Sequence, residues 1–275
     1  MIRSARRTRR LLQTAGAGAA ALMALSACSS SDGSSSVAGS SSGSSSVSRK
    51  LSGTVNVFAA ASLQESFTEL GKEFEKQHPG TKVTFNFGGS DTLAASITSG
   101  APADVFAAAS PKTMATVTDQ NDAVGTPATF VRNQLEIATL PGNPDRISSL
   151  KDLTKSALKV VLCDRTVPCG AAAQKVLEAA ALKVTPVSYE QDVKSALTKV
   201  ELKEADAALV YKTDVKSAGD KVEGVDFSES VKAINDYPIA RLKNAQNAAA
   251  GEAFIALVQS AEGQRVLGEA GFLKP

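Results

Sequence analysis

Residues 53–107 read GTVNVFAAASLQESFTELGKEFEKQHPGTKVTFNFGGSDTLAASITSGAPADVFA and alternate between strand and helix patterns. Val55 and Val57 alternate with polar neighbours, and Val83, Phe85 and Phe87 do the same, which is the period of a β-strand. Between these segments, apolar residues recur at helical spacing from Leu63 to Phe74, and a second helical pattern follows Gly88 and Gly89. This strand–helix–strand–helix–strand order predicts an α/β fold, with a mainly parallel sheet and helices on both faces.

The alternation resumes after Gly125 and continues to the C-terminus. Strand patterns lie at 135–137, 158–162 and 207–211, and helix patterns lie around 171–181, 193–202, 248–260 and 262–270. The roughly 225 residues from Leu51 to Pro275 exceed one typical doubly wound unit, so we expect two lobes. We place residues 51–128 with 239–275 in the first lobe and residues 129–238 in the second. Hinges are expected near 127–133 and 235–239, the second stiffened by Tyr237-Pro238.

The N-terminus has the pattern of an export signal. Five arginines precede an apolar stretch over residues 11–25, which is too short and too rich in Ala and Gly for a transmembrane span. The segment Leu25-Ser26-Ala27-Cys28 resembles the lipobox of bacterial lipoproteins. We therefore expect residues 1–27 to be a signal peptide and Cys28 to be lipidated. Residues 28–50 would then be the anchor and a disordered tether, of which Ser29–Ser48 is almost entirely Ser and Gly. The alternative is a cysteine that happens to follow a cleaved signal. The protein is expected outside the cytoplasmic membrane, anchored to its outer face.

The charge of the mature chain argues against nucleic acid as a partner. Removing residues 1–27 removes five arginines and no acids, so 30 − 5 = 25 basic residues face 28 acidic ones, a net charge of −3 instead of +2.

Two cysteines remain once Cys28 carries lipid. Cys163 and Cys169 are expected to pair as a disulfide in an oxidising compartment. The alternative is a pair of free buried thiols.

The sequence lacks the residue patterns of common enzymes. Its single histidine, His78, lies in a His-Pro-Gly turn and is predicted to be a surface residue. No zinc pattern, nucleophile elbow or phosphate loop is present. We expect a protein that is not an enzyme and carries no cofactor.

Small residues recur where helices are predicted to begin. Ser62, Ser90, Gly170 and Val193 all occupy such positions. A helix N-terminus has unpaired N–H groups and a partial positive charge, so several of them around one cleft would bind an oxyanion. Taken singly, each serine could equally be an ordinary N-cap.

In combination, these segments resemble the molybdate-binding proteins of ABC importers. The matching blocks, in order, are 58–63, 87–93, 100–106, 167–170, 192–193, 209–211 and 271–272. The resemblance covers residues 53–275. It implies a two-lobed type II periplasmic-binding-protein fold that closes on molybdate or tungstate, acts as a monomer and delivers the anion to an importer permease.

The resemblance also implies the ligand-binding residues. Ser62 and Ser90 would donate from the first lobe through hydroxyl and backbone groups. From the second lobe, Cys169 and Val193 would donate backbone N–H groups, and Tyr211 its phenol. Other interpretations stay open: Val193 as a core valine, Tyr211 as a packing residue, and Cys169 as a disulfide partner only.

Two positions depart from the family pattern. Cys169 stands where an alanine is common, and Asp91 stands where a serine is common, next to Ser90. We expect Asp91 to point away from the ligand and cap its helix. Asp104 matches a family motif, and we interpret it as a structural residue that bonds backbone groups near the end of the sheet.

Three other functions remain to be separated from molybdate binding. The first is a binding protein of the same fold for sulfate or a ferric complex. The second is a hydrolase with Ser62 or Ser90 as nucleophile, for which a base is missing. The third is a surface lipoprotein that binds no small ligand.

Overall fold

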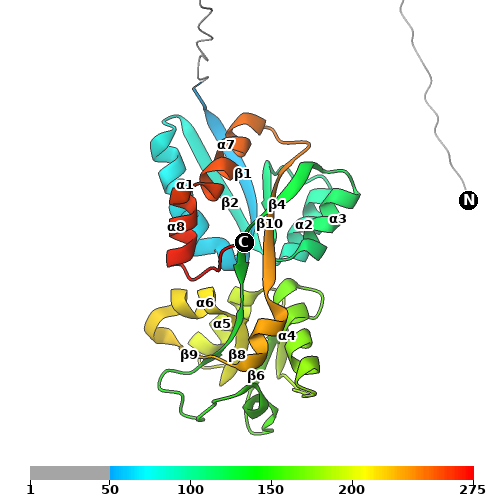
Figure 1. Ribbon diagram of the computed structural model, residues 1–275, viewed down its shortest axis with the longest axis vertical. Helices are drawn as coiled ribbons and strands as arrows, with labels where there is room; N and C mark the ends of the chain where they lie inside the picture. Colours follow the sequence, from blue (N-terminus) through cyan, green and yellow to red (C-terminus); the bar gives the residue numbers. More distant parts are fainter. Residues whose placement is uncertain (1–49) are drawn as a thin grey trace, which may run out of the picture. The chain divides into compact units, whose positions relative to one another are not determined.

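The computed structural model describes residues 50–275, which fold around two five-stranded sheets (Figure 1). The predicted signal peptide, the predicted lipidation site at Cys28 and the predicted Ser29–Ser48 tether lie outside the described residues. No helix between Lys50 and Pro275 combines the length and the apolar character needed to cross a membrane.

The first sheet has the strand order β2-β1-β3-β10-β4. Its strands are β1 (Gly53–Ala60), β2 (Thr81–Gly88), β3 (Val105–Ala107), β4 (Ala123–Asn133) and β10 (Asn235–Leu242). Strands β2 and β3 pair in parallel with β1, whereas β10 runs antiparallel to both β3 and β4.

The second sheet repeats this pattern in the order β7-β6-β8-β5-β9. Its strands are β5 (Leu135–Thr139), β6 (Val160–Cys163), β7 (Ser188–Glu190), β8 (Ala207–Tyr211) and β9 (Glu223–Val225). Strands β7 and β8 are parallel to β6, and β5 is antiparallel to β8 and β9. The two-lobed α/β architecture is confirmed, but both sheets are mixed, because strands next to the lobe crossings run against the parallel set.

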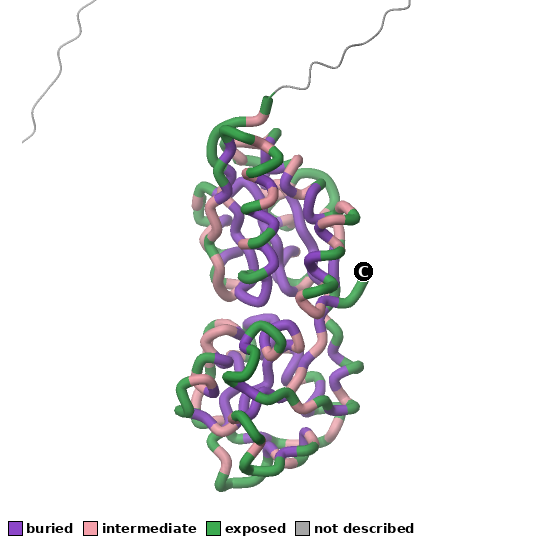
Figure 2. Tube along the Cα trace, turned by 90° about the vertical axis from the view of Figure 1, so that its left-hand side faces the viewer, coloured by how far each residue is buried: buried purple, intermediate pink, exposed green. Residues whose placement is uncertain are grey.

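Helices cover both faces of the first sheet because its strands alternate their side chains. Val55, Val57 and Ala59 of β1 belong to one buried cluster, and Phe58 belongs to another on the opposite face. The first cluster lies under α1 (Gln64–Gln77), α7 (Ala248–Gln259) and α8 (Ala261–Glu269), and the second under α2 (Ser90–Thr98) and α3 (Pro111–Asp119). Figure 2 shows buried chain running through the middle of both lobes.

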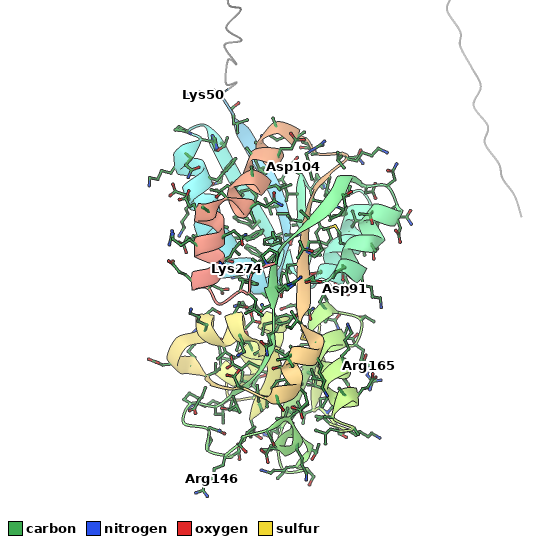
Figure 3. All side chains as sticks on the ribbon, viewed as in Figure 1. Lys50, Asp91, Asp104, Arg146, Arg165 and Lys274 are labelled. Carbon is green, nitrogen blue, oxygen red and sulfur yellow. A yellow bond between two sulfur atoms is a disulfide. The ribbon has the colours of Figure 1, made fainter. Side chains whose placement is uncertain are left out.

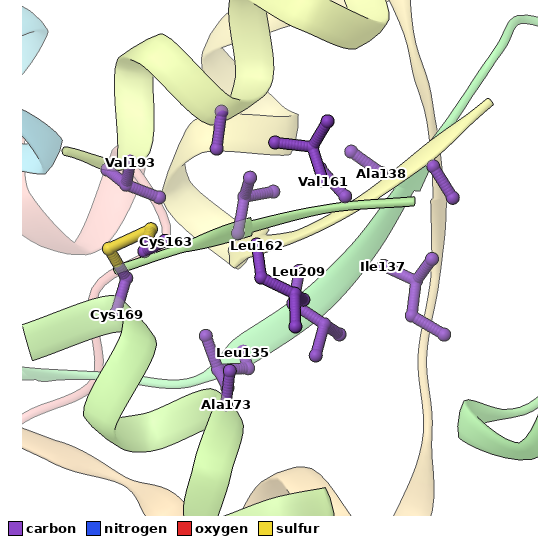
Figure 4. Packing of buried hydrophobic residues seen from close by; sticks show 14 of the residues in the cluster. Leu135, Ile137, Ala138, Val161, Leu162, Cys163, Cys169, Ala173, Val193 and Leu209 are labelled. Atoms are coloured by element: carbon purple, nitrogen blue, oxygen red, sulfur yellow. A yellow bond between two sulfur atoms is a disulfide. The ribbon is translucent and has the colours of Figure 1, made fainter. Parts of the chain in front are cut away.

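The second lobe has one continuous core. It is packed between the sheet and the helices α4 (Pro168–Ala179), α5 (Val193–Glu201) and α6 (Lys212–Ala218). Leu135, Val161 and Leu209 lie at its centre (Figure 4). A short 3₁₀ helix, Leu150–Thr154, carries a capping box formed by Ser149 and Asp152.

Two strands carry the chain between the lobes. Only Gln134 separates β4 in the first sheet from β5 in the second, and β10 brings the chain back from the 3₁₀ helix Ser228–Ala233. The boundaries predicted for the lobes, 128/129 and 238/239, fall inside β4 and β10.

Candidate ligand-binding site

One small pocket brings together all five predicted ligand-binding residues. Ser62, Ser90, Cys169, Val193 and Tyr211 line it, and each is at least nine-tenths buried. The empty space between its walls is at most about 230 Å³. That is below the usual range for drug-sized ligands, so the pocket suits a small solute.

Four helical segments begin at this pocket. They are the 3₁₀ helix Ala61–Leu63, which leads into α1, and helices α2, α4 and α5. The first-turn N–H groups of a helix have no partner within it, and the helix dipole adds partial positive charge there. Two of these ends come from the first lobe and two from the second, so the pocket offers donors from both sides.

Neither serine is a helix cap. Ser90 is the first residue of α2, not the N-cap, and its Oγ accepts a hydrogen bond from the Ala109 N–H at 3.0 Å. Ser62 lies inside the 3₁₀ helix, and its Oγ is 2.8 Å from the phenol oxygen of Tyr237. The N-cap interpretation therefore fails for both residues, and both line the pocket.

Val193 and Cys169 each occupy the first turn of a helix. Val193 opens α5, and its side chain belongs to the core of the second lobe. The N-cap of α5 is Asp192, whose two carboxylate oxygens accept from the N–H and Oγ of Ser195 at 2.9 and 2.8 Å. This carboxylate is therefore engaged with its own helix although it borders the pocket.

A disulfide joins Cys163, at the end of β6, to Cys169 in the first turn of α4 (Figure 4). Their Cα atoms are 5.8 Å apart, so the free-thiol alternative is wrong for this structure. Gly170 follows, and a Cβ there would lie 1.8 Å from the Asp164 carbonyl oxygen. The start of α4 thus packs main chain against main chain, which only glycine permits.

Tyr211 ends strand β8 with a buried phenol. Its oxygen accepts a hydrogen bond from Nδ2 of Asn235 at 3.0 Å. Burial, and next the neighbouring Tyr237, raise the pKa of Tyr211 well above its usual 10. The phenol therefore keeps its proton at neutral pH and can act as a donor.

Three residues behind the pocket were not predicted as part of the site. Asn235 donates to the phenol of Tyr211, and Asn133 donates to that of Tyr237, which in turn is hydrogen-bonded to the hydroxyl of Ser62. Tyr237 had been assigned only a role in stiffening a hinge. No local sequence signal marked the two asparagines, because each lies at the end of a strand and its partners are distant in the sequence.

The predictions made for Asp91 and Asp104 have different outcomes. Asp91 is the second residue of α2, already past the capping position, and its Oδ1 is buried with no hydrogen-bond partner among the described residues. The prediction that it caps the helix is wrong. Asp104 accepts from the N–H groups of Asn56 and Asn247 at 2.7 and 2.8 Å, so its structural role is confirmed. Figure 3 shows Asp91 near the second lobe and Asp104 toward the opposite end of the first.

The chemistry of the pocket is that of a donor set without formal positive charge. None of the described residues that line it is Lys, Arg or His. Residues 50–275 contain no group of three or more His, Cys, Asp or Glu side chains placed to hold a metal ion. His78 lies at the C-terminal end of α1 against the ring of Phe74, away from the pocket lining.

A family model for the bacterial extracellular solute-binding proteins matches residues 55–273. The chain belongs to that family. As a solute-binding protein it is similar to the molybdate-binding protein ModA of Mycobacterium tuberculosis H37Rv, with 42% identity over 222 residues that cover 81% of this chain and 85% of the relative. It is 30% identical over 224 residues to a putative ABC transporter substrate-binding lipoprotein, YvgL, of Bacillus subtilis, covering 80% and 86% of the two chains.

The fold of this solute-binding protein also occurs in solved structures. The periplasmic molybdate-binding protein of Azotobacter vinelandii superimposes with a TM-score of 0.71 over 80% of this chain and 99% of its own, at 20% identity. At that identity the likeness concerns the fold alone. The pocket of this solute-binding protein lies between its two lobes, with lining residues from both.

Proposed function

We propose that this solute-binding protein captures molybdate or tungstate in the pocket between its lobes and delivers the anion to an ABC importer permease. The observation that carries the proposal is the convergence of Ser62, Ser90, Cys169, Val193 and Tyr211 on one pocket. The similarity to ModA supports the same solute.

The donor set selects the charge state of the ligand. Hydroxyl and backbone N–H groups can satisfy the oxygens of a fully ionised tetrahedral anion from both lobes. A protonated phosphate would bring an O–H group that needs an acceptor, and leaving it unpaired in a buried site is costly. Spacing suited to long metal–oxygen bonds would also leave sulfate too small to reach every donor.

Closure follows from the same contacts. An anion that bridges the two lobes favours the closed arrangement by its greater affinity for that state. The strands β4 and β10 are the proposed hinges, because they carry the chain between lobes. The closed surface would then dock on the permease as a monomer, without enzymatic activity and without a cofactor.

Lipid anchoring at Cys28 completes the proposal. The lipobox-like segment before Cys28 supports acylation at the outer face of the membrane, and the Ser/Gly tether would let the lobes reach the permease.

Thermal unfolding of soluble protein that begins after Cys28 tests the assignment. At roughly a thousand times the dissociation constant, a ligand stabilises by about 4 kcal/mol, which raises the melting temperature by at least ~8 °C at this size. Large shifts with molybdate and tungstate, and small ones with sulfate and phosphate, are expected. A shift only with sulfate would identify the same fold working on another anion. No shift with any anion would favour a lipoprotein without a small ligand.

A further inference from the structure

The hydroxyl of Ser90 receives a hydrogen bond whose direction is fixed. The Ala109 N–H points at Ser90 Oγ at 3.0 Å, and a backbone N–H can only donate. Ser90 must therefore accept this bond. Its own proton remains available for an acceptor inside the pocket.

The same peptide segment fixes the direction at Tyr211. Asn235 Nδ2 donates to the Ala109 carbonyl oxygen at 2.8 Å, and that oxygen can only accept. This contact sets which end of the amide carries the nitrogen. The second proton on Nδ2 points at the Tyr211 oxygen, 3.0 Å away, so Tyr211 accepts this bond and keeps its own proton to donate.

A longer chain of hydrogen bonds leads to Ser62. The Gln134 N–H donates to Asn133 Oδ1 at 2.9 Å, which places Asn133 Nδ2 toward the Tyr237 oxygen at 3.4 Å and Thr213 Oγ1 at 2.8 Å. Tyr237 accepts from Asn133 and can donate its own proton to Ser62 Oγ, 2.8 Å away, the direction on which the inference below depends. Ser62 then keeps its proton for the pocket.

We propose that Asn133, Asn235 and Tyr237 are positioning residues for the bound anion. They turn the hydroxyl protons of Ser62 and Tyr211 into the pocket, so the site accepts tetrahedral oxyanions that carry no proton and rejects those that carry one. The inference rests on the proposed function and deepens it, because it names what sets the selectivity. Asn133 ends β4 and Asn235 begins β10, so the strands that link the lobes also orient the ligand donors.

Replacing one of these amides with a carboxyl group tests the direction of the hydroxyl proton separately from the charge of the anion. In Asn235→Asp, the new carboxylate accepts a hydrogen bond from the Tyr211 phenol, whose oxygen then presents a lone pair to the pocket. At about pH 8, molybdate, sulfate and hydrogen phosphate all carry close to two charges, so the carboxylate repels them alike. Only hydrogen phosphate has a proton to give to the Tyr211 oxygen.

The expected result, measured by calorimetric titration, is a change in relative affinity. In the wild-type protein, hydrogen phosphate binds at least about tenfold more weakly than the anions without a proton. In Asn235→Asp, the affinity for molybdate falls, and the ratio of phosphate to molybdate affinity rises by about tenfold or more. Asn235→Leu, which removes the donor without adding an acceptor, leaves this ratio unchanged.

A second pair of variants repeats the test at Ser62. Asn133→Asp should turn the Tyr237 proton away from Ser62 and raise the same ratio, whereas Asn133→Leu should not. If the Asn235 variants do not fold, as shown by the loss of cooperative thermal unfolding, the Asn133 pair provides the test. A ratio that stays constant in the folded carboxylate variants, or that rises equally in the leucine variants, would overturn the inference.

The wild-type protein separates this inference from the function itself. Binding of sulfate without binding of molybdate, with hydrogen phosphate still rejected, would remove the proposed function and leave the proton ordering in place. Binding of molybdate together with equally tight hydrogen phosphate would do the reverse. A wild-type protein that binds none of the three anions overturns both.

Discussion

Lys194 of the second lobe lies 2.9 Å from Glu65 of the first, measured from Nζ to Oε2. Lys194 follows the pocket residue Val193 on α5, and Glu65 is in the first turn of α1. The same ammonium group lies 3.4 Å from Asp214 Oδ1 within its own lobe. The Glu65 contact exists only while the lobes are together, so this ion pair favours the closed arrangement.

Glu65→Gln should weaken molybdate binding by two- to fivefold. An ion pair with one half-exposed partner contributes at most about 1 kcal/mol, and salt screens it. Calorimetric titration at low and high salt should show the loss mainly at low salt. The control is Glu204→Gln, which breaks the Lys199–Glu204 pair inside the second lobe and should leave the affinity unchanged. An equal loss in both variants would contradict the role in closure.

Gly89→Ala should hold the lobes apart. A Cβ on Gly89 would lie 2.4 Å from the carbonyl oxygen of Gln191 on the opposite lobe. Relieving such overlap costs about 1–3 kcal/mol, so the affinity should fall roughly ten- to hundredfold while the ligand-free melting temperature changes little. Titration and small-angle X-ray scattering with saturating molybdate would measure both effects.

The control for this change is Gly268→Ala, where a Cβ meets no atom within 4 Å. It should bind and compact like the wild type. Normal compaction of Gly89→Ala on adding molybdate would rule out the proposed obstruction.

Replacing Cys163 and Cys169 together with alanine should lower the free energy of unfolding by about 2 kcal/mol, the chain-entropy value for a loop of six residues. Urea unfolding measures this term. If the bridge also sets the position of the Cys169 N–H, the molybdate affinity of the folded variant falls as well. Unchanged affinity would limit the disulfide to a structural role.

Asp214 should make the protein less stable as the pH rises from about 4 to 6. Burial raises the pKa of Asp214 to about 6, opposed by Lys194 and by the Tyr211 N–H that its Oδ2 accepts at 3.0 Å. The unfolded carboxyl titrates near ~3.9, so within this window the folded state holds the extra proton. The free energy of unfolding therefore falls with rising pH, by up to about 3 kcal/mol in total.

The measurement is urea unfolding of the wild type and Asp214→Asn across this pH range. The stability of the variant relative to the wild type should increase between pH ~4 and ~6 and level off above that. Parallel curves for the two proteins would show that Asp214 does not titrate in this range.

Local patterns predicted most elements of the fold. Strand β8 has the predicted bounds of 207–211, and α5 ends one residue before the predicted helix 193–202. The long strand β4 was not foreseen, because Gly125 and Pro127 within it are typical of turns. Its pairing with β10, which includes two irregularities in register, overrides that local preference.

The sequence predicted the residues that line the candidate site, but not the residues behind them. Ser62, Ser90 and Val193 occupy helix starts that the sequence displays directly. Asn133 and Asn235 lie about a hundred residues apart and act through hydrogen bonds that form once β4 and β10 pair. No spacing rule along one chain encodes such a contact, so these residues needed the three-dimensional arrangement.

Two of the proposed donors belong to the main chain, at Cys169 and Val193 in the first turns of α4 and α5. Every residue except proline carries such an N–H group. Over generations, either side chain can therefore be exchanged for another that packs equally well, and the anion would meet the same donor. A one-residue deletion in the loop ahead of either helix would have the opposite effect, because it moves the helix start while both residues survive in the sequence. For two of the five proposed ligand-binding residues, selection would therefore preserve the position of the helix start more strictly than the identity of the amino acid.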